Sequence, residues 1–143
     1  MPFPAPHPGL VIHYAYLWHV EHLRGQEEGV KDRPCVIVLS TESAGGEMVV
    51  TVLPITHSPP FDPSAAVEIP LTTKQRLGLD SERSWVVCSE LNRFVWPGPD
   101  LRPIPGRLGD IAYGVLPPGL FQQIKAQVLM LADARRLRAI ARS

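Results

Sequence analysis

Sixteen prolines among 143 residues constrain this chain more than any other feature of its sequence. Proline has no amide hydrogen and a fixed φ, so it is excluded from helix interiors and central strands. The chain must therefore be divided into many short elements, which favours a β-rich domain over a helical bundle. Hydrophobic residues make up 45% of the sequence, enough for one packed core, and the length suits a single domain.

Short apolar runs between the prolines predict about five antiparallel strands. They are expected at residues 9–18, 34–40, 47–56, 66–69 and 84–90, with a last short strand at 108–114. A short helix is expected at 72–77, where Gly78 closes it, and loops are expected at 19–32 and 92–106. We therefore predict a mainly β (α+β) fold, a small and partly open antiparallel barrel with a helix packed on it.

A long helix is predicted over residues 117–142, with Pro117 and Pro118 in its first turn. Its apolar residues lie on one stripe at helical spacing: Leu120, Phe121, Ile124, Val128 and Leu131. Residues 128–131 are apolar nearly all round, so this part is buried on more than one side. Two interpretations remain open for that surface, burial in the core or contact with a second copy of the chain.

The ends of the chain differ in character. Residues 1–8 alternate with proline and are expected to form an extended arm, followed by a single domain at 9–143. The N-terminus resembles neither a signal peptide nor a transit peptide, and no apolar run reaches membrane-spanning length. We therefore expect a soluble, cytoplasmic protein that does not enter a membrane.

The net charge is zero, but residues 101–143 hold seven Lys and Arg against two acidic residues. Most of this excess comes from four residues near the C-terminus: Arg135, Arg136, Arg138 and Arg142. Such a basic end can contact nucleic acid or an acidic partner. It can equally be a solvated helix end, where cations are favoured by the helix dipole.

The two cysteines, Cys35 and Cys88, both lie in apolar strand-like runs. Free cysteine behaves as a small hydrophobic residue, so both are expected to be buried thiols. No cluster of Cys and His has the short spacing of a metal site, and no cofactor is expected.

Three side chains could form a phosphate site at one edge of the barrel. Arg33 stands where a strand begins, and Thr56 and His57 stand where another strand ends. A fixed cation, a hydroxyl and an imidazole brought together would suit a phosphodiester. On this evidence alone they could also be three unrelated surface residues.

Four stretches of the chain resemble the MazF/PemK (Kid-like) toxins of type II toxin–antitoxin systems. They are Gly9 with the aromatic strand that follows it, Gly25-Gln26-Glu27-Glu28-Gly29 leading into residues 33–40, Leu53-Pro54-Ile55-Thr56-His57-Ser58, and residues 113–131. The resemblance implies an SH3-like barrel of the CcdB/MazF type, usually a homodimer. It also implies an endoribonuclease that cuts single-stranded RNA without metal, through attack by the 2′-hydroxyl, and that is inhibited by a cognate antitoxin.

The resemblance also assigns catalytic roles to residues of this chain. Arg33 matches the family's essential arginine, and Thr56 matches a threonine that can bind a phosphate oxygen. His57 occupies a position where relatives carry Ser or Thr, and it can transfer protons near neutral pH. Either Glu27 or Glu28 corresponds to the family's loop glutamate, which would act as a base or hold Arg33 in place.

Kid-like members carry an acidic residue directly after the cysteine that corresponds to Cys88. Here Ser89 takes that place and Glu90 is displaced by one residue, which changes its face unless a bulge intervenes. The expected RNA-binding residues in this region are Glu90, Asn92, Arg93, Trp96 and Arg102. Three further histidines are expected to be non-catalytic: His13, His19 and His22.

Two other functions stay open from the sequence. CcdB-like proteins share this type of barrel but poison DNA gyrase by binding, without catalysis. A non-toxic module that binds nucleic acid or protein through the basic C-terminal segment is the other. Loss of function on changing Arg33 would favour the nuclease, whereas loss on changing Arg135, Arg136 and Arg138 would favour the binding module.

Overall fold

The computed structural model describes residues 3–26, 31–107 and 109–142. These residues form eight strands, three α-helices and a 3₁₀ turn at Pro63–Ala65. In chain order the elements are β1 (Leu10–Tyr14), α1 (His19–Leu23), β2 (Arg33–Glu42), β3 (Met48–Thr56), β4 (Ala66–Glu68), α2 (Leu71–Leu77), β5 (Trp85–Val87), β6 (Glu90–Val95), β7 (Ala112–Val115), α3 (Pro118–Asp133) and β8 (Arg138–Ala141).

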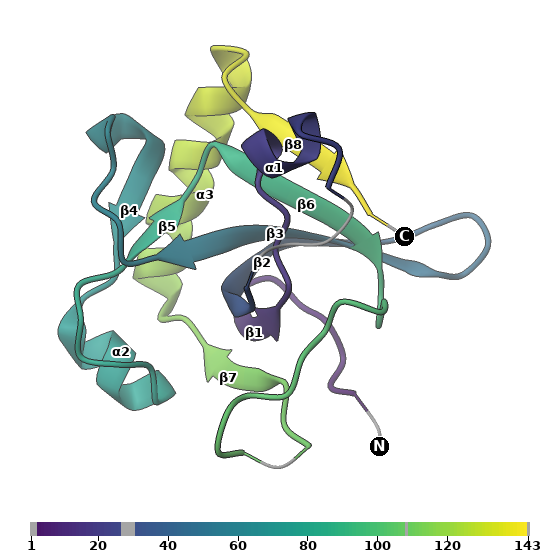
Figure 1. Cartoon of the computed structure of the whole chain (residues 1–143), viewed down its shortest axis with the longest axis horizontal. Coiled ribbons are helices and arrows are strands. Elements are labelled where there is room, and N and C mark those ends of the chain that lie inside the picture. Colours follow the sequence, from purple (N-terminus) through teal and green to yellow (C-terminus); the bar gives the residue numbers. More distant parts are fainter. Residues whose placement is uncertain (1–2, 27–30, 108, 143) are drawn as a thin grey trace.

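The strands form one strongly curved sheet in the order β4-β5-β3-β2-β1-β7, shown in Figure 1. Strand β3 pairs along its other edge with both β5 and β6, and β8 extends the sheet beyond β6. All pairs are antiparallel except β6 with β8. This mainly antiparallel, open sheet with a C-terminal helix confirms the predicted partly open barrel.

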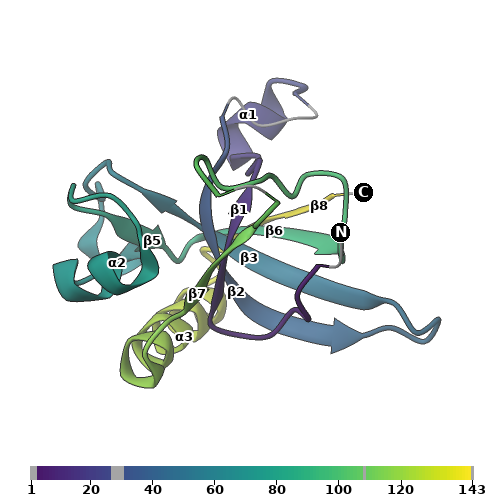
Figure 2. The same cartoon turned by 90° about the horizontal axis from the view of Figure 1, so that it is seen from below.

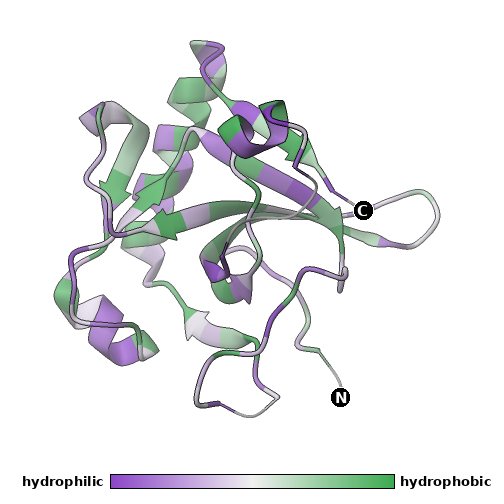
Figure 3. Ribbon diagram, viewed as in Figure 1, coloured by the Kyte–Doolittle hydropathy of each residue, from purple (hydrophilic) through white to green (hydrophobic). Residues whose placement is uncertain are grey.

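The central strands are buried on both faces because helix α3 covers one face and residues of the segment after β6, among them Leu101 and Ile111, cover the other. Neighbouring residues of β1 separate accordingly: Val11 packs in the cluster that contains Ile124 and Leu131 of α3. Ile12 packs in the opposite cluster, with Leu101. Figure 2 shows α3 on one side of the sheet, and Figure 3 shows the mostly hydrophobic central strands. This explains why these strands read as continuous apolar runs.

Both cysteines are buried free thiols, as predicted. Cys35 and Cys88 are fully enclosed, one in each hydrophobic cluster. Burial raises the pKa of the Cys88 thiol to about 12 and also raises the pKa of Cys35. Neither thiol is therefore available as a nucleophile at neutral pH.

The β2–β3 hairpin carries an irregularity that decides which residues face each other. Near the turn, Leu39 pairs with Thr51, whereas beyond the irregularity Ile37 pairs with Val52. Val38 is thus an extra residue in β2, a β-bulge that shifts the register by one. The hairpin itself projects from the rest of the sheet (Figures 1 and 2).

A buried polar group joins the C-terminal strand to the rest of the barrel. The fully buried side chain of Asn92 accepts a hydrogen bond from Leu17 N and donates one to Leu17 O, both at 2.9 Å. Arg142 donates to Asn92 Oδ1 at 3.1 Å and to Ala15 O at 2.8 Å. Its guanidinium also lies 3.0 Å from a carboxylate oxygen of Asp100. These contacts fix the 15–17 segment against β6 and β8.

The predicted helix over 117–142 is wrong at its C-terminal end. Helix α3 ends at Asp133, and Arg135 adopts a positive φ of 56° that turns the chain. Residues 138–141 then form β8, in which Ile140 is buried. Backbone pairing with β6 and this apolar contact outweigh the helix propensity of Ala, Arg and Leu.

Two predicted loops contain regular structure. Residues 19–32 include helix α1, and residues 92–106 include most of strand β6. In β6 the alternation of buried Asn92 and Phe94 with exposed Arg93 is a strand pattern, hidden in the sequence by a polar residue in the core. None of the helices in the described residues is long and apolar enough to cross a bilayer.

The buried amide of Asn92 should be essential for stability. We expect Asn92→Ala to lower the free energy of unfolding by about 2–5 kcal/mol, because it leaves both backbone groups of Leu17 without a partner. Urea denaturation would measure the change. Arg93→Ala, at the exposed neighbouring position, is the control and should change stability by less than about 0.5 kcal/mol. Equal effects of the two substitutions would contradict this role.

Candidate functional site

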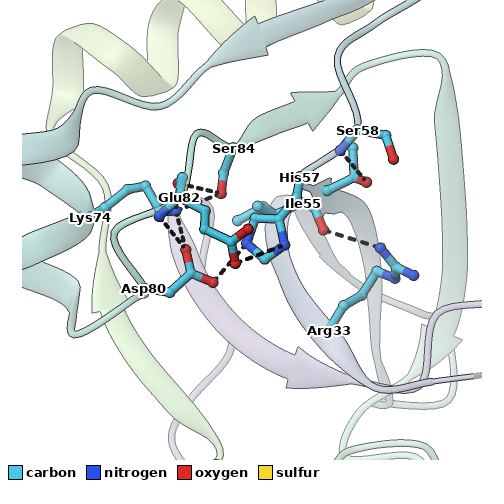
Figure 4. Close-up of polar contacts among 9 residues, drawn as sticks. Arg33, Ile55, His57, Ser58, Lys74, Asp80, Glu82 and Ser84 are labelled. Atoms are coloured by element: carbon cyan, nitrogen blue, oxygen red, sulfur yellow. Dashed lines mark hydrogen bonds and ion pairs between the residues drawn. The ribbon is translucent and has the colours of Figure 1, made fainter.

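A cleft of about 210 Å³ lies where β2 begins and β3 ends, and Arg33, Thr56 and His57 all line it. The register explains why they meet. Cys35 pairs with Pro54, and Arg33 Nη1 lies 3.5 Å from Ile55 O, which places Arg33 beside the end of β3 that carries Thr56. The opposite wall is formed by Lys74 of α2 and by Asp80 and other residues of the segment before β5. Figure 4 shows this arrangement.

The guanidinium of Arg33 is held in place but has few partners. Its Nη1 donates one long hydrogen bond of 3.5 Å to Ile55 O, and its buried Nε has no partner. Burial lowers the pKa of Arg33. Arg33 makes no ion pair with any acidic residue in the part of the chain that the structure describes. A partly desolvated cation with unused donors is the kind of group that binds a phosphate.

An aromatic ring positions Arg33 from behind. The guanidinium lies 5.0 Å from the centre of the Trp18 ring, a cation–π contact. Trp18 in turn packs edge-on against Tyr16, with ring centres 5.3 Å apart. Its backbone N–H donates to Glu21 Oε1 at 3.0 Å, which fixes the start of α1. Helix α1 therefore supports the site although the sequence predicted a loop there.

Thr56 is the last residue of β3, where it pairs with Trp85 of β5. Its Oγ1 accepts a hydrogen bond from Ser58 N at 3.2 Å. A hydroxyl that accepts in this way still has its own hydrogen to donate. Thr56 is thus a fixed hydroxyl donor on the same cleft as Arg33.

His57 lies between two carboxylates. Its Nε2 is 2.6 Å from Asp80 Oδ2, and its Nδ1 is 3.9 Å from Glu82 Oε2. The imidazole remains about half exposed, with 46% of its side-chain surface accessible. A carboxylate on one ring nitrogen fixes the ring and stabilises the imidazolium, as in histidines that act as bases.

A buried lysine fixes Asp80 in turn. Lys74 Nζ lies 2.6 Å from both Asp80 Oδ1 and Ser84 Oγ, and it also donates to Glu82 O. Only 2% of the Lys74 side chain is exposed. Desolvation opposes ionisation of Asp80, but hydrogen bonds from Lys74 and His57 outweigh it, so the pKa of Asp80 is lowered. Asp80 is therefore an anion at neutral pH.

Gly78 brings Asp80 to the cleft. It ends α2 with a φ of 74°, the left-handed conformation that glycine adopts without strain. A Cβ at this position would also clash with the guanidinium of Arg107. The chain can therefore reverse directly after α2 and present Asp80 and Glu82 to His57.

Lys74, Asp80 and Glu82 belong to the site although the sequence did not predict them. One signal was available: the Gly78 helix end is followed at once by Asp80 and Glu82. No spacing rule connects these residues to His57, however, because the contact spans more than twenty residues and depends on how α2 packs.

Glu27 and Glu28 lie outside the described residues. None of the five predicted RNA-binding residues lines the cleft. Asn92 is fully buried, so it cannot contact RNA and its assignment is wrong. Glu90 Oε1 accepts hydrogen bonds from Tyr16 Oη and His19 N, both at 3.1 Å, and burial raises its pKa.

The other three predicted contacts lie at separate places. Arg93 is exposed on β6 and borders an apolar groove with Lys125 of α3. Trp96 stacks on Phe94, with ring centres 6.2 Å apart. Arg102 Nε lies 3.8 Å from Asp32 Oδ1, and Asp32 lines the cleft beside Arg33.

One group of residues in the cleft has the donors to hold a cation. Ligand atoms of His57, Asp80 and Glu82 lie within 4.8 Å of one another. The ammonium of Lys74 already neutralises Asp80 from the other side, which weakens the attraction of this group for a metal ion. His57 and Asp80 can instead act as a hydrogen-bonded pair for proton transfer, with the Glu82 carboxylate 3.9 Å from the other ring nitrogen.

Lys74 should stabilise the folded protein in a pH-dependent way. We expect Lys74→Met to lower the free energy of unfolding at pH 7 by about 2–4 kcal/mol, because three acceptors lose a charged donor. Urea denaturation at several pH values would measure it. Arg76→Met, an exposed cation on the same helix, is the control and should have little effect.

The sign of the pH dependence follows from Asp80. Its pKa is lowered in the folded state, so its ionised form stabilises the fold above the ordinary value of 3.8. That contribution is lost as the pH falls through the lower folded value. The difference in free energy of unfolding between wild type and Lys74→Met should therefore be smaller at pH 3 than at pH 7. A difference that does not change with pH would contradict the Lys74–Asp80 contact.

A comparison with known protein families matches the part of the chain that contains the cleft. No curated protein matches the chain. The model of the family described as PemK-like, MazF-like toxin of type II toxin-antitoxin system matches residues 16–94, more than half of the chain. The match includes Arg33, Thr56, His57, Lys74 and Asp80, and it ends before α3 and β8. The chain therefore belongs to the PemK-like, MazF-like toxin family of type II toxin–antitoxin systems.

Proposed function

We propose that this toxin is an endoribonuclease that cuts single-stranded RNA without metal, using the 2′-hydroxyl of the substrate as the nucleophile. The observation that carries the proposal is the shared cleft of Arg33, Thr56 and His57. As the 2′-oxygen bonds to phosphorus, the bond from phosphorus to the 5′-oxygen breaks, so the reaction needs a base for the 2′-hydroxyl, a proton for the departing 5′-oxygen and donors for the charge that develops on the phosphate. In the cleft, Arg33 and Thr56 are suited to the last task, and His57 can take up the first proton, which its imidazolium form can then give to the 5′-oxygen.

Arg33 and Thr56 are the proposed phosphate-binding residues. A phosphate opposite Arg33 would meet guanidinium donors that have only one long hydrogen bond to the protein. The Thr56 hydroxyl can donate to a second oxygen. Both groups are fixed before substrate binds, so stabilising the transition state costs little reorganisation.

His57 is the proposed general base. In the neutral imidazole, a proton on Nε2 that is donated to Asp80 leaves Nδ1 free to accept the proton of the 2′-hydroxyl. Asp80 and Glu82 then stabilise the imidazolium that forms. In the sequence analysis Glu27 or Glu28 was an alternative base, and both stay predictions.

The family implies an antitoxin partner. RNA as the substrate is part of the proposed function. The homodimer and the cytoplasmic location that were expected from the sequence stay predictions. The exposed apolar side chains Leu129 and Met130 of α3 are compatible with a contact to a second copy.

Arg33 provides the first test of the nuclease. We expect purified protein in EDTA to cut a long single-stranded RNA and to leave a cyclic phosphate end. Arg33→Ala should lower kcat by about 10²- to 10³-fold, because a fixed donor to the developing charge is removed. Gel analysis of the RNA and the circular dichroism of the variant give the two readouts. Arg76→Ala, an exposed cation on α2, should retain activity.

Each alternative outcome of this assay has a distinct meaning. Activity that disappears in EDTA and returns with a divalent cation would contradict the metal-independent reaction and favour a metal at His57, Asp80 and Glu82. Growth arrest by a protein that leaves many different RNAs intact would favour a gyrase-binding toxin. Loss of binding on changing Arg135, Arg136 and Arg138 but not Arg33 would favour a non-toxic binding module.

His57 provides the second test. His57→Gln should lower kcat by about 10²- to 10⁴-fold, because glutamine can fill the site but cannot take a proton. Asp80→Asn should also lower kcat, since it no longer stabilises the imidazolium. His22→Gln, at an exposed histidine of α1, is the control. Full activity of His57→Gln would assign the base to Glu27 or Glu28.

A further inference from the structure

A second groove, of about 610 Å³, adjoins the Arg33 cleft. Ser58 lines both hollows, so one opens next to the other at the end of β3. One wall of the groove is the 58–66 segment, and the other is the turn and strand start at 135–138. Trp85 of β5, the pairing partner of Thr56, lines it between them. We call this hollow the Phe61 groove.

The side chain of Phe61 is fully exposed at the rim of the groove. Three prolines surround it, Pro59, Pro60 and Pro63, and they limit the conformations of the segment. A fully exposed phenylalanine contributes nothing to the core and costs free energy in water. A stiff loop that presents an aromatic face is suited to stacking on a planar ligand.

The opposite wall is positively charged. Arg135 and Arg138 are exposed, and neither makes an ion pair with another residue that the structure describes. Arg136 has a different role, because it pairs with Asp62 across the groove. Gln127 of α3 donates to Ser64 O beside that pair. These contacts hold the two walls at a fixed separation, so the groove is built into the fold.

We propose that the Phe61 groove binds the single-stranded RNA that extends beyond the cleaved bond, with a base stacked on Phe61 and phosphates on Arg135 and Arg138. This inference rests on the proposed function, because it concerns the same RNA as it leaves the Arg33 cleft. Aromatic faces beside a basic track are the usual means of binding single strands without reading their sequence. The continuity at Ser58 gives the strand a path from one hollow to the other.

The charge of the groove favours RNA over an apolar protein segment. Two arginines on one wall, at positions 135 and 138, make no ion pair within 4 Å with a described residue, although Arg138 also attracts Glu90 of the neighbouring strand, and the acid that lines the groove, Asp62, is already paired with Arg136. The more apolar groove of the molecule lies elsewhere, along α3 near Leu129. A polyanion that is also aromatic fits the Phe61 groove better than a hydrophobic helix does.

A non-cleavable ligand tests the groove separately from catalysis. Oligonucleotides with 2′-O-methyl groups lack the nucleophile, so fluorescence anisotropy can measure the Kd of a trinucleotide and of a decanucleotide. The wild-type protein should bind the longer oligonucleotide more tightly. Phe61→Ala should weaken binding of the decanucleotide by about 5- to 100-fold, the range for removal of one stacked base. The gain in affinity with length should then largely disappear.

Arg135 and Arg138 can be tested separately, through the salt dependence of RNA binding. Arg135→Ala combined with Arg138→Ala should reduce the slope of log Kd against log salt concentration by about 0.7 for each phosphate that is no longer neutralised. Matched controls on other surfaces are Lys125→Ala of α3 and Phe3→Ala of the N-terminal segment, which should leave both Kd and slope unchanged. Phe61→Tyr and Arg135→Lys should retain most of the affinity.

Several results would overturn the proposal. The proposal would be wrong if Phe61→Ala and the double arginine variant bound the decanucleotide as tightly as the wild-type protein does. It would also be wrong if these variants lost as much affinity for the trinucleotide as for the decanucleotide. Unchanged RNA binding together with weaker binding of a 20-residue acidic peptide would assign the groove to a protein partner. Because these oligonucleotides cannot be cut, failure of the nuclease assay on Arg33 leaves this result interpretable, and the two failures are distinguishable.

Discussion

The register between β2 and β3 is the constraint on which the site depends. Near the turn, Glu42 pairs with Met48, and an uninterrupted hairpin would carry that register onward to place Arg33 opposite His57. The bulge at Val38 shifts the pairing by one residue, so that Cys35 pairs with Pro54 and the extended register would place Arg33 opposite Thr56 instead. A shift of one residue also exchanges the faces of a strand. The bulge therefore decides which side chain lies nearest Arg33 in the cleft and which one is left to contact Asp80.

The elements around this hairpin hold its open end in a fixed shape. Strand β3 pairs with β5 at the site and with β6 further back along the same edge, and with β2 as far as Pro54 along the other edge. The 15–17 segment is fixed to β6 through Asn92, and it leads directly to Trp18, on which Arg33 stacks. A buried amide far from the cleft thus positions the ring that orients the candidate catalytic arginine.

The sequence predicted what depends on local patterns and missed what depends on packing. The barrel, the strands around Arg33 and Thr56, and the buried cysteines follow from apolar runs and turn residues. Strand β6 was missed because Asn92 interrupts its apolar alternation, and the amide is satisfied only by a segment 75 residues away. Lys74 and Asp80 were missed for the same reason, since the contact of Asp80 with His57 exists only in the folded protein and Lys74 acts on it through Asp80.

The C-terminal segment shows how a wrong element changes a functional argument. In the predicted helix, residues 135 and 138 would share one face, because they are three positions apart, and residue 136 would lie on another. The turn at Arg135 and the strand that follows bring all three to the rim of one groove. There Arg136 forms an ion pair with Asp62, whereas Arg135 and Arg138 are exposed to solvent. The excess of basic residues in the C-terminal part of the sequence is therefore concentrated beside the cleft, at residues 135–138. The family match ends at residue 94 and does not include these residues.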